Sequence, residues 1–117
     1  MQYQEFEKAV DQLTEIANLP AASKAPEFLY DKIRAYLLLS RCYRQLGNFE
    51  SAEGAIRLAL ELDGSDPLLH RELGYVYVAL QRNTEAAEAF EDYLKRAPAA
   101  QDAGTIKNLI NRLVIPE

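Results

Sequence analysis

The chain has 117 residues, of which 49% are hydrophobic and 26% are charged, and this composition is typical of a single globular domain that can bury a core. Its 13 basic and 18 acidic residues leave a net charge of −5, which opposes sequence-independent binding to nucleic acid. One cysteine and one histidine exclude an internal disulfide and the usual Cys/His zinc cage, so we expect no metal and no cofactor.

The N-terminal segment MQYQEFEKAV has neither the basic start nor the apolar stretch of a secretory signal. No apolar run in the chain approaches the roughly 20 residues that a membrane-spanning helix needs. We therefore expect a cytoplasmic protein that does not insert into a membrane.

The first predicted element is an N-terminal helix over residues 1–19. Its apolar residues recur at spacings of three and four, which places them on one helical face; they are Phe6, Ala9, Leu13 and Ile16. The prolines that follow predict a loop over residues 20–28.

Two units of 34 residues follow in one register, which predicts a structural repeat over residues 33–66 and 67–100. The matching pairs in the first half of each unit are Tyr36 with His70, Leu39 with Leu73, Ser40 with Gly74, Tyr43 with Tyr77 and Leu46 with Leu80. Those in the second half are Ala52 with Ala86, Ile56 with Phe90 and Leu60 with Leu94. Both halves have helical spacing, so each unit is predicted to be two antiparallel helices. The segment RELGYVYVAL, residues 71–80, is then helical although its aromatic and β-branched residues favour a strand.

The ends of the predicted helices carry recognisable signals. Gly47 and Asn48 predict the turn inside the first unit, and Asp66 followed by Pro67 predicts the N-cap and first residue of the next helix. After the second unit, an apolar stripe predicts a C-terminal capping helix within residues 101–117, with Asp102 or Thr105 as its cap. The stripe consists of Ile106, Leu109, Ile110 and Leu113.

The second unit carries a family pattern at fixed positions: Leu73, Gly74, Tyr77, Ala86, Phe90 and Pro98. The first unit carries Tyr36, Ser40, Ala52 and Ala59 at the equivalent places, with Gly64 where proline is usual. Together with the 34-residue period, this pattern resembles the tetratricopeptide repeat over about 68 residues. The resemblance implies an all-α helical repeat of two full antiparallel helix pairs, flanked by the N-terminal helix and the capping helix.

The residues that could carry chemistry have simpler structural explanations, so we do not expect an enzyme. Cys42 follows the packing pattern of its helix and is predicted to be an inert buried thiol. His70 takes the bulky packing position of the repeat, so a half-buried ring with a hydrogen-bonded tip is expected. The acidic residues of the last predicted repeat helix alternate with alanines and predict a solvated face; they are Glu85, Glu88, Glu91 and Asp92.

In the family that these repeats resemble, the first helix of each unit lines a concave groove where peptides bind. The residues predicted for that groove are Arg34, Leu37, Leu38, Arg41, Arg44, Gln45, Arg71, Tyr75 and Val78. Residues 33–46 hold three arginines and no acid, in a chain that is acidic as a whole. Arginine forks suit carboxylates, so the predicted function is a non-catalytic adaptor that binds an acidic, partly apolar peptide or helix of a protein partner.

Two other functions fit the same pattern. The end helices could stack on other copies, which would make the chain a self-assembling structural subunit or homo-oligomer. The chain could also be the regulatory repeat domain of a larger enzyme complex. A separate alternative concerns the groove itself, because the N-terminal helix or the loop after it could cover Leu37 and Leu38.

Overall fold

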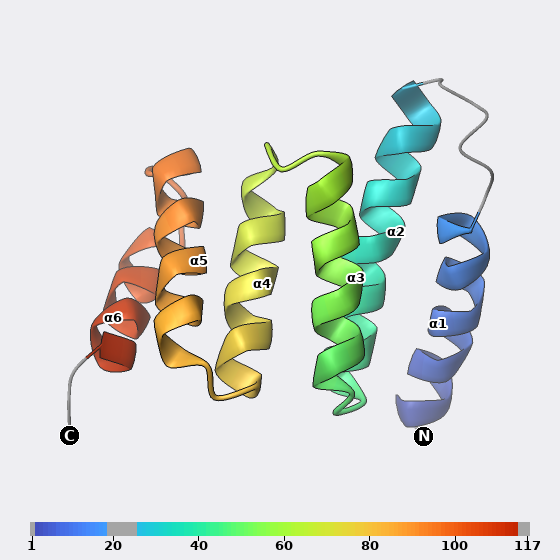
Figure 1. Cartoon of the computed structure of the whole chain (residues 1–117), viewed down its shortest axis with the longest axis horizontal. Helices are drawn as coiled ribbons and strands as arrows, with labels where there is room; N and C mark the ends of the chain where they lie inside the picture. Colours follow the sequence, from blue (N-terminus) through green and yellow to red (C-terminus); the bar gives the residue numbers. More distant parts are fainter. Residues whose placement is uncertain (1, 19–25, 115–117) are drawn as a thin grey trace. The chain divides into compact units, whose positions relative to one another are not determined.

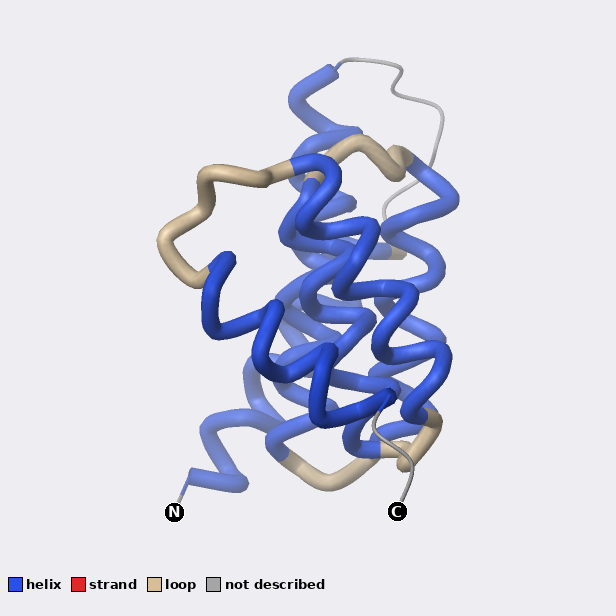
Figure 2. The backbone as a smooth tube through the Cα atoms, turned by 90° about the vertical axis from the view of Figure 1, so that its left-hand side faces the viewer, coloured by secondary structure: helices blue, strands red, loops and turns tan. Residues whose placement is uncertain are grey.

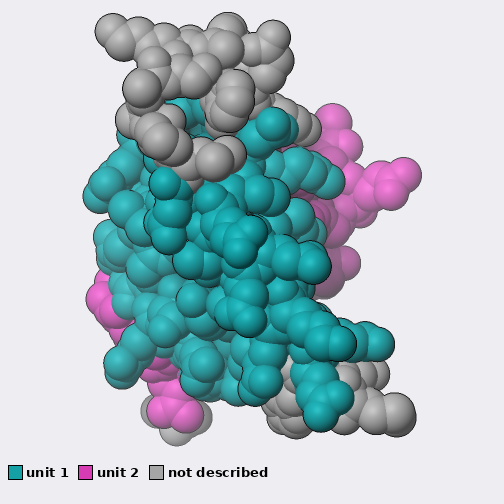
Figure 3. Space-filling view, turned by 90° about the vertical axis from the view of Figure 1, so that its right-hand side faces the viewer, with its two compact units in different colours: residues 1–63 teal, residues 64–117 magenta. Residues whose placement is uncertain are grey.

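The structure, a computed structural model, describes residues 2–18 and 26–114, and these form α-helices and no strand (Figures 1 and 2). The helices are α1 (Gln2–Ala17), α2 (Pro26–Gln45), α3 (Phe49–Leu62), α4 (Pro67–Ala79), α5 (Asn83–Arg96) and α6 (Ala103–Val114). They divide into two compact units, residues Met1–Asp63 and Gly64–Glu117, called unit 1 and unit 2 below (Figure 3). The predicted all-α helical repeat is confirmed.

Helix α2 begins earlier than the repeat register suggests. Pro26 is its first residue, so residues 26–28 are helical, whereas the sequence predicted a loop over 20–28. Proline suits this first position because its fixed φ is already helical and the NH that it lacks would have no partner there. Residues 19–25 of the expected loop lie outside the described part of the chain.

Unit 1 contains three helices, of which α2 is central. Helices α1 and α3 both pack on α2, and both run antiparallel to it (Figure 1). The core between them contains the buried Leu39 and Ala55, with partly buried side chains packed around them: Val10, Leu13, Tyr36 and Tyr43. The hydroxyl of Ser40 donates a hydrogen bond of 2.9 Å to the carbonyl oxygen of Ala52, which ties α2 to α3.

Unit 2 is built from α4, α5 and α6, with α5 contacting both of the others. Its buried core consists of Tyr77, Ala86, Ala89, Phe90, Tyr93 and Ile106. The predicted stripe of the capping helix packs here, since Leu109, Ile110 and Leu113 lie against this core. At the start of α4, the Asp66 carboxylate accepts a hydrogen bond of 2.9 Å from the backbone NH of Leu68, which confirms the predicted N-cap.

The helix ends after α2 and α4 have the same geometry at positions 34 residues apart. Gly47 has φ +81° and Gln81 has φ +62°, both in the left-handed region. In each turn the next residue donates back five positions, from Asn48 to Tyr43 at 2.8 Å and from Arg82 to Tyr77 at 2.9 Å. This is the Schellman arrangement, which usually has glycine at its left-handed position. The predicted turn at Gly47 is confirmed, and unit 2 makes the same turn with a residue that is strained there.

Replacing Gln81 by glycine is expected to raise the free energy of unfolding by about 0.5–1 kcal/mol, because the relief of left-handed strain exceeds the added chain entropy of glycine. The matched change in the other unit, Gly47→Ala, is expected to lower it by about 1 kcal/mol. Urea denaturation followed by circular dichroism measures both. A Gln81→Gly variant less stable than the wild-type chain would show that the side chain of Gln81 has a stabilising role that outweighs its strain.

Candidate functional site

A hollow of about 280 Å³ lies between α1 and α2 in unit 1. Helix α1 contributes Leu13 and Ile16 to its lining, and α2 contributes Asp31, Arg34, Ala35 and Leu38. Apolar side chains therefore surround one acidic and one basic group. Such a combination can take an apolar side chain of a partner and orient a charged group next to it.

Arg34 and Leu38 are the two predicted groove residues that line this hollow. The Arg34 side chain is exposed and Leu38 is half-buried. Of the hollow's other lining residues, Asp31 was not predicted for the site, because sequence spacing alone does not show that α2 begins at Pro26 and carries position 31 on the same face.

The remaining predicted residues of α2 differ in accessibility. Gln45 is exposed, and Arg41 and Arg44 are half-buried and also interact with other groups of the chain. Leu37 has only 4% of its surface exposed, because it is part of the buried core. It therefore offers a partner almost no contact area, in contrast to its predicted place on the groove surface.

The three predicted residues of α4 contribute to the packing of unit 2. Tyr75 lies edge-on against Phe90, with ring centroids 5.2 Å apart and planes at 75°. Val78 packs against the same core. Arg71 donates a hydrogen bond of 3.1 Å from Nη1 to the Asp102 carboxylate and lies over the Tyr93 ring, 5.7 Å from its centroid. Each of these side chains thus has a structural role within its own unit.

Asp102 joins the three helices of unit 2 at one point. It directly precedes α6, and its carboxylate accepts hydrogen bonds from Arg71 of α4 and from the Tyr93 hydroxyl of α5, the latter at 2.5 Å. The hydrogen bond from Tyr93 is the main cause that lowers the pKa of Asp102, and Arg71 lowers it further. Burial, followed by the bond to Asp102, raises the pKa of Tyr93. The sequence suggested Asp102 only as a helix cap, because spacing does not reveal partners 31 and 9 residues away.

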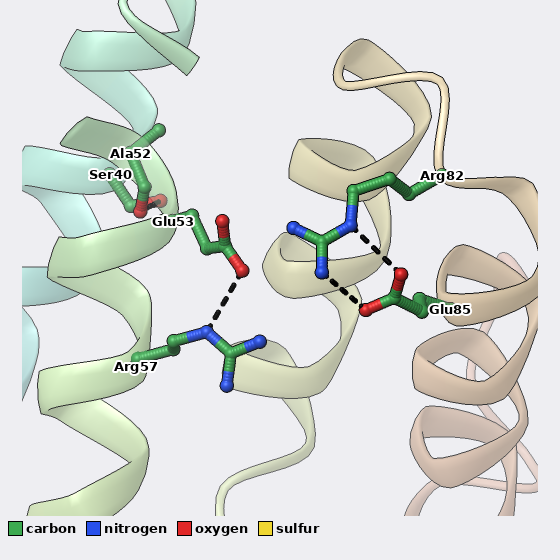
Figure 4. A network of polar contacts seen from close by, with 6 residues as sticks. All are labelled: Ser40, Ala52, Glu53, Arg57, Arg82 and Glu85. Carbon is green, nitrogen blue, oxygen red and sulfur yellow. Dashed lines mark hydrogen bonds and ion pairs between the residues drawn. The ribbon is translucent and has the colours of Figure 1, made fainter. Parts of the chain in front are cut away.

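The side chains that could have carried chemistry, His70, Cys42 and Glu85, have structural surroundings. His70 lies half-buried with its Nε2 2.8 Å from the carbonyl oxygen of Gly64, as predicted. Cys42 is a buried free thiol whose pKa is raised by desolvation, which disfavours the reactive thiolate. Glu85 forms an ion pair with Arg82 at 2.6 Å (Figure 4). Within residues 2–18 and 26–114, no group of three or more His, Cys, Asp or Glu side chains is arranged to hold a metal ion.

A second hollow, of about 260 Å³, lies on a different side of α2 and was not predicted. Its lining comes from all three helices of unit 1 and from Asn18, directly after α1: Thr14, Asn18, Tyr36, Leu39, Tyr43, Ser51, Gly54, Ala55 and Leu58. Gly54 is the one sequence signal for it, since a glycine inside helix α3 costs about 0.5–1 kcal/mol relative to alanine. The α1 and α2 residues of the two hollows differ, and helical geometry places the hollows on either side of the α1–α2 contact.

Comparison with known proteins identifies the fold. The chain is similar to the solved structure of the Arabidopsis OM64 TPR domain, with a TM-score of 0.64 and 20% identity, over 93% of this chain and 99% of that one. No curated protein gave a significant match. In the described part of the chain, no helix has the length and apolar character needed to cross a membrane. A family model described as Tetratricopeptide repeat matches residues 39–111, more than half of the chain. The chain therefore belongs to the tetratricopeptide repeat family, whose members are protein–protein interaction modules and are generally non-catalytic.

Proposed function

We propose that the protein is an adaptor whose α1–α2 hollow binds an acidic, partly apolar peptide or helix of a protein partner. The observation that carries this proposal is the hollow itself, in which the exposed Arg34 stands among Leu13, Ile16 and Leu38. A guanidinium fork binds a carboxylate through two parallel hydrogen bonds, and the leucines accept an apolar side chain.

The charges along α2 give the bound segment a direction. Asp31 lies at the N-terminal side of Arg34 in the hollow, while Arg41 and Arg44 follow toward the C-terminal end of the helix. Arg41, seven residues after Arg34, lies on the same face of the helix, so a peptide with its acidic groups toward Arg41 gains attraction, whereas an acid beside Asp31 is repelled. The preferred ligand therefore carries a neutral or basic residue near Asp31 and carboxylates beyond it.

Reversing the charge of Arg34 is expected to weaken binding of an acidic peptide about tenfold, which corresponds to a loss of about 1.4 kcal/mol. The probe is a fluorescein-labelled peptide of about 15 residues built from Glu and Leu, long enough for about four helical turns. Fluorescence anisotropy gives the Kd of the wild-type chain, of Arg34→Glu and of Arg112→Glu, a variant with the same charge change on the exposed part of α6.

The control separates a local contact from a general charge effect. Arg112→Glu is expected to keep the wild-type Kd within about twofold near ~0.15 M salt, because Arg112 does not line the hollow and an exposed charge that makes no contact with the ligand is then largely screened. Equal losses in both variants, or no binding of the acidic peptide by the wild-type chain, would rule out the α1–α2 hollow as the acidic-peptide site.

A further inference from the structure

The second hollow of unit 1 is a groove between two parallel helices. Helices α1 and α3 run in the same direction and both pack on α2 (Figure 1). Tyr36, Leu39 and Tyr43 of α2 line the groove between residues of α1 and residues of α3. A segment lying in such a groove would contact three helices at once, and this is how an amphipathic helix is usually held on a helical protein.

The groove is open at Gly54 because this position has no side chain. A Cβ built there meets no atom within 4 Å, so nothing inside the described chain requires a glycine. Gly74 is different, since a Cβ there would lie 2.5 Å from a ring carbon of Phe90. Glycine inside a helix is unfavourable relative to alanine, and Gly54 lines the hollow. Its effect is to leave room for an occupant from outside.

An exposed apolar side chain stands beside this opening. Leu58 lines the groove one helical turn after Gly54 and has 44% of its surface exposed. Leu62 continues the same face of α3 with 37% exposed. Ser51, on the other side of Gly54, is small and exposed. The α3 wall thus offers an apolar contact next to a place where a backbone can approach closely.

In the described part of the chain, no charged residue lines the groove itself, and the charges around it are exposed acids elsewhere on α1 and α3. Helix α1 carries four acids and one lysine, and its acids are exposed: Glu5, Glu7, Asp11 and Glu15. Glu7 and Asp11 lie on the same face of α1 as Thr14, which lines the groove. On α3, Glu50 and Glu61 are exposed, while the only basic residue, Arg57, bonds to Glu53 at 2.9 Å (Figure 4). The field at the groove therefore favours a cationic occupant.

We propose that the α1–α3 groove is a second docking surface, which binds a basic amphipathic helix of a protein partner. Apolar side chains of that helix lie against Leu58 and the half-buried Tyr43, its backbone approaches Gly54, and its lysines or arginines face Glu7, Asp11 and Glu61. Since Arg34 lines the α1–α2 hollow, the two surfaces of unit 1 select ligands of opposite charge. The protein would then connect an acidic segment of one partner with a basic segment of another.

The test uses the full chain and a tryptophan-containing amphipathic peptide of Leu and Lys. The chain has no tryptophan, so the emission and anisotropy of the peptide report binding directly. Gly54→Leu fills the groove, and Gly104→Leu is its matched control, because Gly104 is the other helical glycine whose added Cβ meets nothing within 4 Å. We expect Gly54→Leu to raise the Kd at least about tenfold and Gly104→Leu to leave it within about twofold. Circular dichroism checks that both variants remain helical.

Charge variants then separate this surface from the α1–α2 hollow. Replacing Asp11 and Glu61 together by lysine is expected to weaken the Leu/Lys peptide about tenfold. Arg34→Glu is expected to leave the Kd of this peptide unchanged or lower it, although it weakens the Leu/Glu peptide. The inference is overturned if the wild-type chain does not bind the Leu/Lys peptide, or if the Gly54 and Gly104 variants bind it equally. Self-association in sedimentation that Gly54→Leu abolishes would assign the groove to a second copy of the chain, and would also overturn it.

Discussion

Substituting Gly74 by serine is expected to lower the free energy of unfolding by about 2–3 kcal/mol, because the added atoms overfill a packed core. A Cβ at this position would lie 2.5, 2.6 and 2.7 Å from three ring carbons of Phe90. The ring is completely buried, and Tyr75 packs edge-on against it. Phe90 therefore cannot move aside without disturbing the core of unit 2. Urea denaturation at neutral pH measures the loss.

The other unit supplies the compensating change for this variant. Ser40 and Ile56 stand at the positions equivalent to Gly74 and Phe90, and both are completely buried. Phe90→Ile alone should cost about 1–2 kcal/mol through the cavity that it leaves. The double variant Gly74→Ser/Phe90→Ile should be more stable than the sum of the single effects predicts, by at least about 1 kcal/mol. Additive losses would show that contact with the Phe90 ring is not the reason for a glycine at position 74.

Removing the Asp102 carboxylate is expected to have the second largest effect. Asp102→Ala loses the hydrogen bonds from Arg71 and Tyr93, so we expect the free energy of unfolding to fall by about 2 kcal/mol at neutral pH. Tyr93→Phe removes one of these two bonds and should cost about half as much. A Tyr93→Phe variant as unstable as Asp102→Ala would mean that Arg71 adds nothing to the arrangement.

The same carboxylate gives unit 2 a pH dependence of known sign. The pKa of Asp102 is lower in the folded chain than its ordinary value of 3.8, chiefly because Tyr93 donates a hydrogen bond to it. As the pH falls below about 3.8, the unfolded chain takes up this proton first, and the stability that Asp102 contributes is lost as the pH falls through the folded pKa. The stability difference between the wild-type chain and Asp102→Asn should therefore be full at pH 7 and shrink below about pH 4. A difference that stays constant down to pH 2 would contradict this assignment.

Most of the fold could be predicted from the sequence because the signals are local or repeated. The 34-residue register places Gly74 opposite Ser40 as a small residue at a helix contact, and Phe90 is found there. Asp66 needs only its own turn to act as an N-cap. In such cases the interaction that fixes the structure lies within a few residues or recurs in the second unit. A single sequence is then enough to predict it.

The surface was less predictable because it depends on partners far apart in the sequence. The helical spacing of α2 places Leu37 beside Arg34 and Arg41, but it does not show that Leu37 is buried. Arg71 has the charge expected of a ligand contact, yet it forms an ion pair with Asp102. Helix α5 separates these two residues in the sequence, so local spacing does not reveal the pair. The groove beside Gly54 is formed by residues of three helices, so it can be recognised only once the tertiary structure is known. For these residues, the packing of the helices decides whether a side chain is buried, paired or accessible to a partner, and local spacing does not.

The two units distribute side-chain volume differently at equivalent positions: serine and isoleucine in unit 1, glycine and phenylalanine in unit 2. This difference affects which helices pair during folding. Helices that share one repeat pattern can pair in the wrong combination, since their apolar faces look alike. Serine against phenylalanine would overfill the contact, and glycine against isoleucine would leave a void, so each wrong pairing carries an energetic penalty. By the repeat register we expect Ser40 to face Ile56 as Gly74 faces Phe90, and we expect this difference in side-chain volume to favour the pairing of α2 with α3 and of α4 with α5.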